Sequence, residues 1–199
     1  MNQTAEFRPL PQTKLAAAGC YVPEGVSPPP VNANSEAIQV MTDLSRVPAA
    51  TVDPKATLEE ANQSMILRGV RLLLVVGEAR KVVGLVTSAD ILGEKPVLVA
   101  QSRRAKRSEL LIADVMIPVE AMETLHIDDV RKASVGNIIA TLKAAGRAHA
   151  LVVGQTNDGK QSLAGIFSAS QIARQLGVQI HTHEMARTFA EIEAVISGV

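Results

Sequence analysis

Residues 82–91 read Val82-Val83-Gly84-Leu85-Val86-Thr87-Ser88-Ala89-Asp90-Ile91 and carry the strongest local signals in the chain. The apolar run before Thr87 predicts a short buried strand, because valine-rich runs suit strands. Thr87 and Asp90 have the spacing of a capping box, which predicts a helix directly after that strand. The unpaired N–H groups of such a helix end attract anions, and Asp90 offers a ribose diol two acceptor oxygens. Because capping boxes also serve structure alone, the motif by itself leaves both roles open.

The same unit occurs a second time. Leu-Val-Val-Gly at 151–154 repeats Leu-Val-Val-Gly at 74–77, and Gly165 follows in the position of Gly84 after a longer turn around Asp158-Gly159. An internal repeat of this length indicates two copies of one supersecondary unit that pack against each other. Asp158-Gly159 is itself a strong hairpin signal.

Ser168 takes the place of Thr87 in the second copy, and Gln171 takes the place of Asp90. Ser with Gln three residues later still predicts a capping box. Gln171 is a poorer diol acceptor, however, because it carries no charge and only one carbonyl oxygen. The two copies therefore differ where a ligand would be recognised.

Each copy is predicted to run strand, helix, strand, strand, helix. In the first copy, Thr57 with Glu60 predicts a capped helix that ends at Gly69, and 72–76 and 82–86 predict a hairpin. The fold class is α/β (α+β), with two pseudo-symmetric repeats forming one module. The predicted divisions are a disordered or extended Pro-rich arm at 1–36, repeats at 37–100 and 112–178, a basic linker at 101–111, and a C-terminal helical segment at 179–199.

Composition excludes several classes of protein. Lys plus Arg and Asp plus Glu both count 20 in 199 residues, so no net field favours nucleic acid or membrane as a partner. Three Phe, one Tyr and no Trp argue against single-strand nucleic-acid binding. The single cysteine, Cys20, excludes an intrachain disulfide and a cysteine zinc site. With neither a signal peptide nor a membrane span in the sequence, a soluble cytoplasmic protein is expected.

The repeated motifs together resemble a tandem pair of cystathionine β-synthase (CBS) domains, the Bateman module, over about residues 37–176. The residues that carry the resemblance are Val40-Met41-Thr42, Thr51-Val52-Asp53-Pro54, Gly69-Val70-Arg71, Leu74-Val75-Val76 and Gly84 to Asp90 in the first repeat, and Asp114-Val115-Met116, Gly146-Arg147, Leu151-Val152-Val153 and Gly165 to Ser168 in the second.

This resemblance implies a homodimeric, non-catalytic sensor of an adenosine ligand: AMP, ADP, ATP or S-adenosylmethionine. It implies one cleft formed by Thr87, Asp90, Met116, Ile117, Pro118, Ala121, Arg147 and Ala148. It implies a mirrored cleft formed by Thr42, Pro48, Ala49, Val70, Arg71, Ser168 and Gln171.

Within the first cleft, the resemblance implies that Asp90 binds the ribose hydroxyls, Thr87 a phosphate or the ribose edge, Ile117 the adenine and Arg147 phosphate. The mirrored cleft lacks the acidic ribose acceptor, although Arg71 gives it one arginine. We therefore expect one tight nucleotide per chain, in the Thr87/Asp90 cleft.

Other residues allow alternatives. His149 fits either a satisfied strand histidine or a ligand contact, whereas Met41, Met116 and Met122 fit core packing. The basic cluster at 103–107 is either a solvated face or a phosphate contact. No metal site is expected, although His181 and His183 either belong to a polar connector or bind a metal.

The C-terminal segment carries one apolar stripe at helical spacing, formed by Met185, Phe189, Ile192 and Ile196. Such a helix either docks on its own module or packs on a dimer mate.

Two functions of different classes follow. One is a homodimeric adenine-nucleotide sensor that acts on a separate protein target, and the other is an interaction scaffold with empty clefts. An enzyme is not expected, because the sequence shows no nucleophile–base pair, carboxylate pair, metal cluster or phosphate loop.

Overall fold

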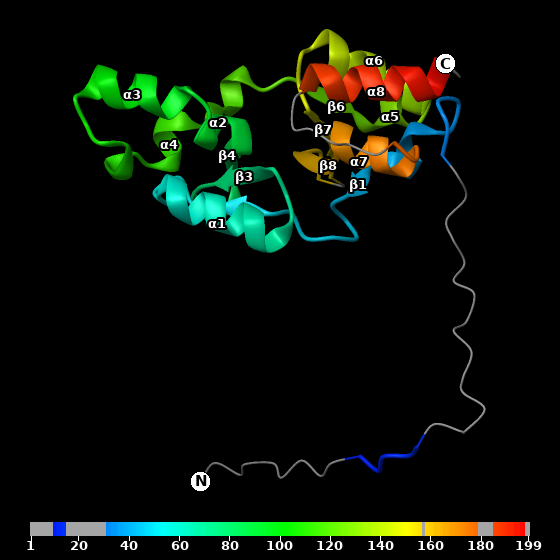
Figure 1. Ribbon diagram of the computed structural model, residues 1–199, viewed down its shortest axis with the longest axis horizontal. Helices are drawn as coiled ribbons and strands as arrows, with labels where there is room; N and C mark the ends of the chain where they lie inside the picture. The colour runs from blue at the N-terminus through cyan, green and yellow to red at the C-terminus, as the bar shows by residue number, and fades with distance from the viewer. Residues whose placement is uncertain (1–9, 15–30, 157, 179–184, 198–199) are drawn as a thin grey trace.

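The computed structural model describes residues 10–14, 31–156, 158–178 and 185–197 (Figure 1). Cys20, Tyr21, His181 and His183 lie outside these residues, so the expectations for them stay predictions. Among the described residues, no helix combines the length and the apolar character that crossing a membrane requires.

The strands form two separate four-stranded sheets, as the α/β fold class predicted. The first sheet has the order β2 (Thr51–Val52), β3 (Leu72–Val76), β4 (Val82–Thr87), β5 (Ile117–Pro118). The second has the order β1 (Thr42–Asp43), β8 (Gln161–Ser168), β7 (His149–Gln155), β6 (Thr124–His126). In each sheet the central hairpin is antiparallel, and the strand that precedes the repeat's long helix pairs with it in parallel.

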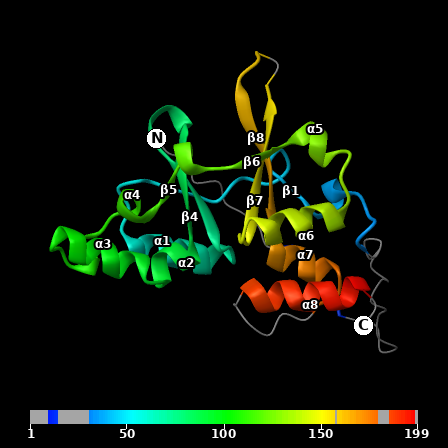
Figure 2. The ribbon, with the colours of Figure 1, turned by 90° about the horizontal axis from the view of Figure 1, so that it is seen from above.

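Helices cover one face of each sheet (Figure 2). We call each sheet with its helices a half of the module. The first half has α1 (Leu58–Arg68), α2 (Ser88–Leu92), α3 (Lys95–Arg103) and α4 (Ile112–Val115). The second half has α5 (Ile127–Val130), α6 (Val135–Ala144), α7 (Ala169–Gln175) and α8 (Met185–Ser197). Short 3-10 turns complete the chain at Ala37–Val40, Glu78–Arg80, Arg107–Glu109 and Val119–Ala121.

The segments that lead into the two repeats are exchanged between the halves. Residues 37–43 place Ala37 and Val40 in the second core, and β1 pairs with β8 of the second sheet. Residues 112–118 place Ile112 and Val115 in the first core, and β5 pairs with β4 of the first sheet. The predicted repeats at 37–100 and 112–178 are therefore continuous in sequence but do not match the spatial halves, because each half takes its edge strand from the other repeat.

The last six residues of the predicted Pro-rich arm at 1–36 belong to the described structure. Residues 31–36 pack on the second half, where the N–H of Val135 donates to the carbonyl of Ser35 at 2.8 Å and that of Gly136 to the carbonyl of Ala33 at 2.9 Å. Val31 packs against the second core. These carbonyls satisfy N–H groups that the first turn of α6 leaves unpaired, and this fixes the end of the arm.

The helix signals of the first repeat are confirmed. Thr57 and Glu60 form a reciprocal capping box at α1, and Gly69 ends that helix with a φ of 63°. The N–H of Val70 then donates to the carbonyl of Met65, which completes a Schellman motif and places Val70 against the first core. Gly146 and Arg147 form the same motif after α6, but there the last position is an arginine.

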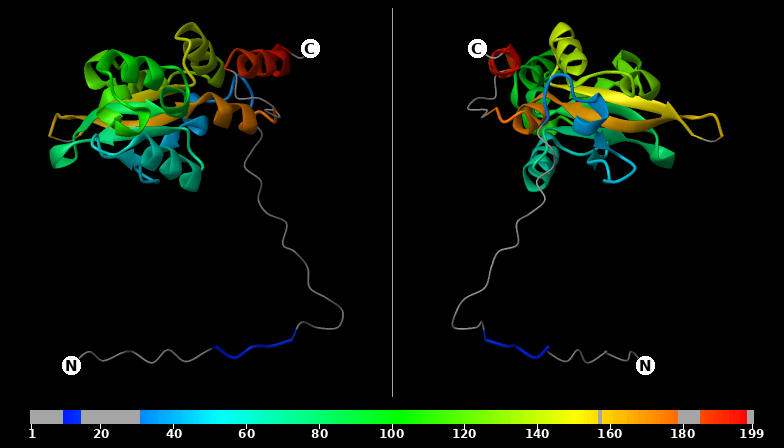
Figure 3. Two further views of the ribbon diagram at one scale, coloured as in Figure 1. Left: turned by 60° about the vertical axis from the view of Figure 1, so that its left-hand side comes forward. Right: turned by 90° about the vertical axis from the view of Figure 1, so that its right-hand side faces the viewer.

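The longer turn in the second hairpin is also confirmed. Thr156 donates its N–H to the carbonyl of Lys160 at 2.8 Å, and Gly159 has a φ of 78°, which glycine adopts without strain. Figure 3 shows the resulting β7–β8 hairpin projecting beyond the rest of the module.

The two sheets meet along an apolar seam. Leu72 and Leu74 of β3 and Leu151 of β7 are buried there, and Leu85 and Ile166 pack against them. Leu73 and Val75 point to the opposite face of β3 and fill the first core. Because side chains alternate along a strand, one valine- and leucine-rich strand contributes to both layers.

Gly84 and Gly165 lie under the exchanged segments. A Cβ on Gly84 would stand 2.5 Å from the carbonyl oxygen of Ile117 and 2.9 Å from Sδ of Met116. For a Cβ on Gly165, the three nearest atoms all belong to the side chain of Met41. Met41 and Met116 pack against the second and first cores respectively, as expected of core-filling methionines.

We predict that Gly84→Ala destabilises the protein by about 2–3 kcal/mol, whereas Gly165→Ala costs under about 1 kcal/mol, because a backbone carbonyl yields less than a methionine side chain. Urea unfolding of both variants measures the difference. In a Met41→Ala background, adding Gly165→Ala should cost almost nothing, whereas Gly84→Ala should remain costly in a Met116→Ala background. Equal costs at the two glycines would contradict this packing argument.

Candidate functional site

A cavity of about 280 Å³ opens between the two halves. Its walls come from the start of β3, the β4–α2 junction, the segment after β5, the start of β7, the start of α7 and one residue of α8. The lining residues are Arg71, Leu72, Leu85, Thr87, Ser88, Ala89, Asp90, Ile117, Ala121, Met122, Glu123, Gly146, Arg147, Ala148, His149, Leu151, Ala169, Ser170 and Thr188.

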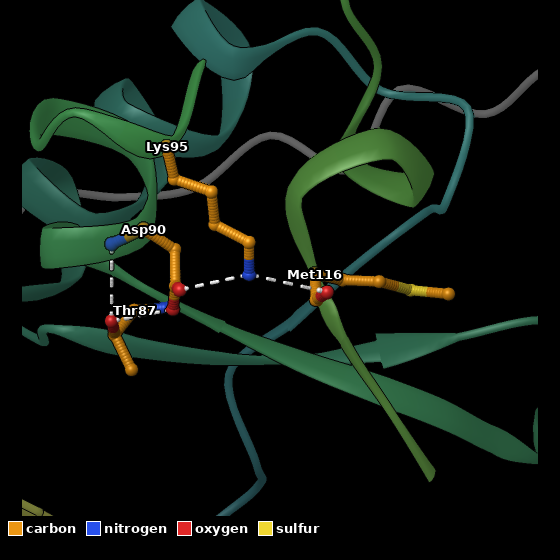
Figure 4. A network of polar contacts seen from close by, with 4 residues as sticks. All are labelled: Thr87, Asp90, Lys95 and Met116. Carbon is orange, nitrogen blue, oxygen red and sulfur yellow. Dashed lines mark hydrogen bonds and ion pairs between the residues drawn. The ribbon is translucent and has the colours of Figure 1, made fainter. Parts of the chain in front are cut away.

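The Thr87–Asp90 motif forms one wall and is held rigidly (Figure 4). Oδ2 of Asp90 accepts hydrogen bonds from the N–H of Thr87 at 2.9 Å and from its hydroxyl at 2.7 Å, so the predicted capping box is confirmed. Oδ1 pairs with Nζ of Lys95 at 3.2 Å, and the side chain of Asp90 is only 14% exposed. The carboxylate is therefore fixed before any ligand arrives.

Lys95 is a residue that the sequence did not reveal. Its Nζ also lies 3.5 Å from the carbonyl of Met116, so it joins the α2–α3 corner to an exchanged segment. Gly93 ends α2 before this lysine, and Asp90 and Lys95 therefore lie on different helices. A helical-spacing argument does not connect them.

Six of the eight residues expected in the first cleft line the cavity: Thr87, Asp90, Ile117, Ala121, Arg147 and Ala148. Met116 and Pro118 do not. Met116 packs against the first core, and Pro118 is an exposed residue of the edge strand β5. Ile117 is the residue between them that reaches the cavity, as strand alternation requires.

Two arginines line this one cavity. Arg147 pairs with Glu123 at 3.1 Å, and the two side chains are 45% and 80% exposed. Such an exposed pair is worth about 0–1 kcal/mol, so a phosphate can displace Glu123. Arg71, expected in the mirrored cleft, lies here as well. The expectation of one arginine in each cleft is corrected, because the Schellman turn at Gly69 directs Val70 to the core and leaves Arg71 at the cavity.

Comparison with known proteins establishes the fold family. Residues 37–96 match the family model of the CBS domain. CBSX2, a CBS-pair protein of Arabidopsis thaliana that has been solved in complex with AMP, shares 20% identity at a TM-score of 0.51, over 70% of this chain and 94% of that one. Residues 37–96 therefore match a CBS domain, and the chain as a whole shares the fold of a CBS-domain pair.

Two further solved structures share the fold of this CBS pair. An uncharacterized conserved protein from Pyrococcus horikoshii has 20% identity and a TM-score of 0.54, over 76% of this chain and 99% of that one. Protein MJ1225 from Methanocaldococcus jannaschii has 22% identity and a TM-score of 0.51, over 70% of this chain and 49% of that one. No curated protein sequence matches the chain.

The mirrored cleft of the CBS pair differs from its expected form. Ser168 does not cap α7 through its side chain, so the capping box predicted with Gln171 is wrong. The side-chain oxygen of Gln171 instead accepts a hydrogen bond from Thr42 at 3.3 Å, and the hydroxyl of Ser168 lies 3.0 Å from that of Ser170. Ala49 packs at the seam between the sheets.

The basic cluster of the CBS pair serves structure at two positions. Arg103 pairs with Asp114, and Arg107 donates to the carbonyl of Ile91 at 3.0 Å. Neither residue lines the cavity. Among the described residues, no group of three His, Cys, Asp or Glu side chains is arranged to hold a metal ion.

His149 lies at the floor of the cavity, paired with Ser168 across the β7–β8 hairpin. Burial lowers the pKa of His149 to about 4, with a smaller contribution from the positive charge of Arg71. The imidazole is therefore neutral at pH 7 and offers a ligand one donor and one acceptor.

We predict a pH dependence of stability that His149 causes. The unfolded histidine binds a proton near pH 6.5 and the folded one only near pH 4, so stability falls as the pH is lowered across that interval. Urea unfolding at a series of pH values measures this slope. His149→Gln should flatten it, and parallel profiles for the two proteins would assign the slope to other groups.

Proposed function

We propose that this CBS pair is a regulatory sensor that binds an adenine nucleotide in the cavity and acts as a homodimer on a separate protein target. One observation carries the proposal: an acid-capped helix N-terminus on one wall shares the cavity with two arginines. The shared fold with CBSX2, which was solved in complex with AMP, supports the same ligand class.

The proposed pose follows from the chemistry of the walls. Asp90 binds the ribose diol through Oδ1, which among the described residues pairs only with Lys95 and keeps an acceptor site, whereas Oδ2 is already occupied by the two bonds from Thr87. Such a charge-assisted hydrogen bond is about twice as strong as a neutral one. Arg147 and Arg71 bind phosphate, a role that the planar guanidinium group suits. Leu85, Ile117 and Met122 supply the apolar surface for the adenine. A cavity near 280 Å³ lies at the small end of ligand sites, which favours a mononucleotide over a larger cofactor.

We predict that Asp90→Ala weakens AMP, ADP or ATP binding by about 1.5–3 kcal/mol, the range for a hydrogen bond to a charged group. Glu60→Ala is the matched control, since Glu60 caps α1 through the same two bonds to Thr57, at 2.8 and 2.9 Å, and does not line the cavity. Both variants lose a cap, and only Asp90→Ala should lose affinity by calorimetry.

If Asp90→Ala and the unmodified protein bind nucleotide with equal affinity, Asp90 does not bind the ribose. If the unmodified protein gives no binding heat with AMP, ADP, ATP or S-adenosylmethionine, the chain is the alternative, an interaction scaffold with empty clefts.

We further predict one tight nucleotide per chain. For the ribose, Gln171 offers one neutral oxygen that already accepts a hydrogen bond from Thr42, so Asp90 is the better partner. For the phosphate, both Arg71 and Arg147 line the cavity that contains Asp90. Both contributions therefore favour the same site. A difference of about 1.4 kcal/mol is tenfold in affinity. Calorimetric stoichiometry measures the number of sites, and Gln171→Asp should strengthen a second one. Two equal sites in the unmodified protein would contradict the asymmetry.

The homodimer is proposed from the surface of the first half. Five large apolar side chains are exposed on its helices α1, α2 and α3: Ile66, Leu67, Leu92, Val97 and Leu98. Exposed apolar area of this kind commonly marks an interaction site.

We predict that light scattering returns twice the monomer mass at micromolar concentration, and that Leu67→Asp shifts the protein toward monomer. Leu10→Asp is the control, since Leu10 is 86% and Leu67 84% exposed, but Leu10 does not belong to helices α1 to α3. A monomeric unmodified protein would refute the dimer.

A further inference from the structure

Helix α8 follows the two repeats in sequence, yet it completes the cavity. Thr188 of α8 lines the cavity and is 7% exposed. Figure 2 shows α8 lying alongside α7, whose first residues Ala169 and Ser170 line the same cavity. A segment outside the repeats therefore contributes a residue to the wall of the ligand site.

Two apolar side chains and one ion pair dock this helix. Phe189 and Ile192 are buried in the second core, so these two residues of the apolar stripe pack on the helix's own module, one of the two alternatives predicted, whereas Ile196 is exposed. Glu193 pairs with Lys143 of α6. Burial of large apolar side chains is the dominant favourable contribution to packing, so these two residues are the main anchor of the helix.

One group on α8 opposes docking. Oε2 of Glu191 is buried and has no hydrogen-bond partner within the part of the chain that the structure describes. Burying an unsatisfied polar atom is unfavourable, and release of the helix would return this oxygen to water. Docking is therefore a balance between apolar burial and carboxylate desolvation.

We propose that α8 is a ligand-linked element of the sensor: Thr188 contacts the bound nucleotide, and nucleotide binding and α8 docking stabilise each other. This rests on the proposed function, since the ligand is the adenine nucleotide of that site. Thermodynamic linkage makes the two effects equal: if docking of α8 raises the affinity for nucleotide by some factor, nucleotide raises the equilibrium constant for docking by the same factor. The cavity lies between the halves, whereas α8 lies on the outer surface of the second half. Docking of the helix thereby signals on that surface that the cavity is occupied.

The test combines calorimetry with hydrogen exchange on the full chain, using AMP and ATP as probes. Nucleotide should slow exchange in 185–197 more than in α1, which does not line the cavity. Thr188→Val should weaken binding about fivefold, the equivalent of one neutral hydrogen bond of about 1 kcal/mol. Ile192→Ala should speed exchange in α8 and weaken binding, and Val195→Ala, at an exposed position of the same helix, should change neither.

A substitution that strengthens docking of α8 distinguishes the proposed linkage from a general loss of stability. Glu191→Leu removes the unsatisfied oxygen, so it should slow exchange in α8 and tighten nucleotide binding. If nucleotide binds the unmodified protein but Thr188→Val and Glu191→Leu leave its affinity unchanged, the α8 proposal is wrong and the proposed function stands. If the unmodified protein binds neither AMP nor ATP, both proposals fail.

Discussion

The exchanged segments are the constraint on which the rest of the molecule depends. Residues 112–118 bury Ile112 and Val115 in the first core, complete the first sheet as β5, and carry Ile117 to the cavity. The close approach of Met116 and Ile117 to Gly84 requires a residue without a side chain at that point of β4. Because each half needs a segment from the other repeat, neither half can complete its sheet, its core or its share of the cavity alone.

The same architecture explains how two similar repeats produce a single cavity that contains the charged residues. The Schellman turn after each long helix fixes two equivalent positions, occupied by Val70 in the first repeat and Arg147 in the second. Val70, which is apolar, packs against the first core, whereas Arg147 lines the cavity. Asp90, Arg147 and Arg71 line one cavity, whereas Gln171 is bonded to Thr42, so the charged groups collect on one side. The asymmetry lies in side chains, while the backbone stays nearly symmetric.

The sequence predicts local structure here because the signals act over three or four residues. Thr57 with Glu60, Thr87 with Asp90, Gly69 and Gly159 each specify their own cap or turn through bonds within one turn of chain. The continuous apolar run of β3 likewise predicts its burial. Six residues of the first cleft were predicted through the family resemblance, which carries tertiary information that spacing does not.

The failures involve contacts that helix and strand periodicity do not encode. Gln171 bonds to Thr42 in place of capping its own helix, and Lys95 reaches Asp90 across the break at Gly93. The placement of Arg71 depends on a turn geometry that its neighbours alone do not reveal. Thr188 lines the cavity because Phe189 and Ile192 dock α8 on the second core. An apolar stripe in the sequence predicts that a helix packs on something, but it does not predict the surface on which the helix packs.

A crystal structure of the protein grown with AMP tests the central claim most directly, since it locates the ligand relative to both halves. The account predicts one nucleotide between them, with its ribose hydroxyls on the carboxylate of Asp90, its phosphate near Arg147 and Arg71, and its adenine against Ile117. A nucleotide bound instead beside Thr42 and Gln171, or within one half and away from residues 112–118, would contradict it.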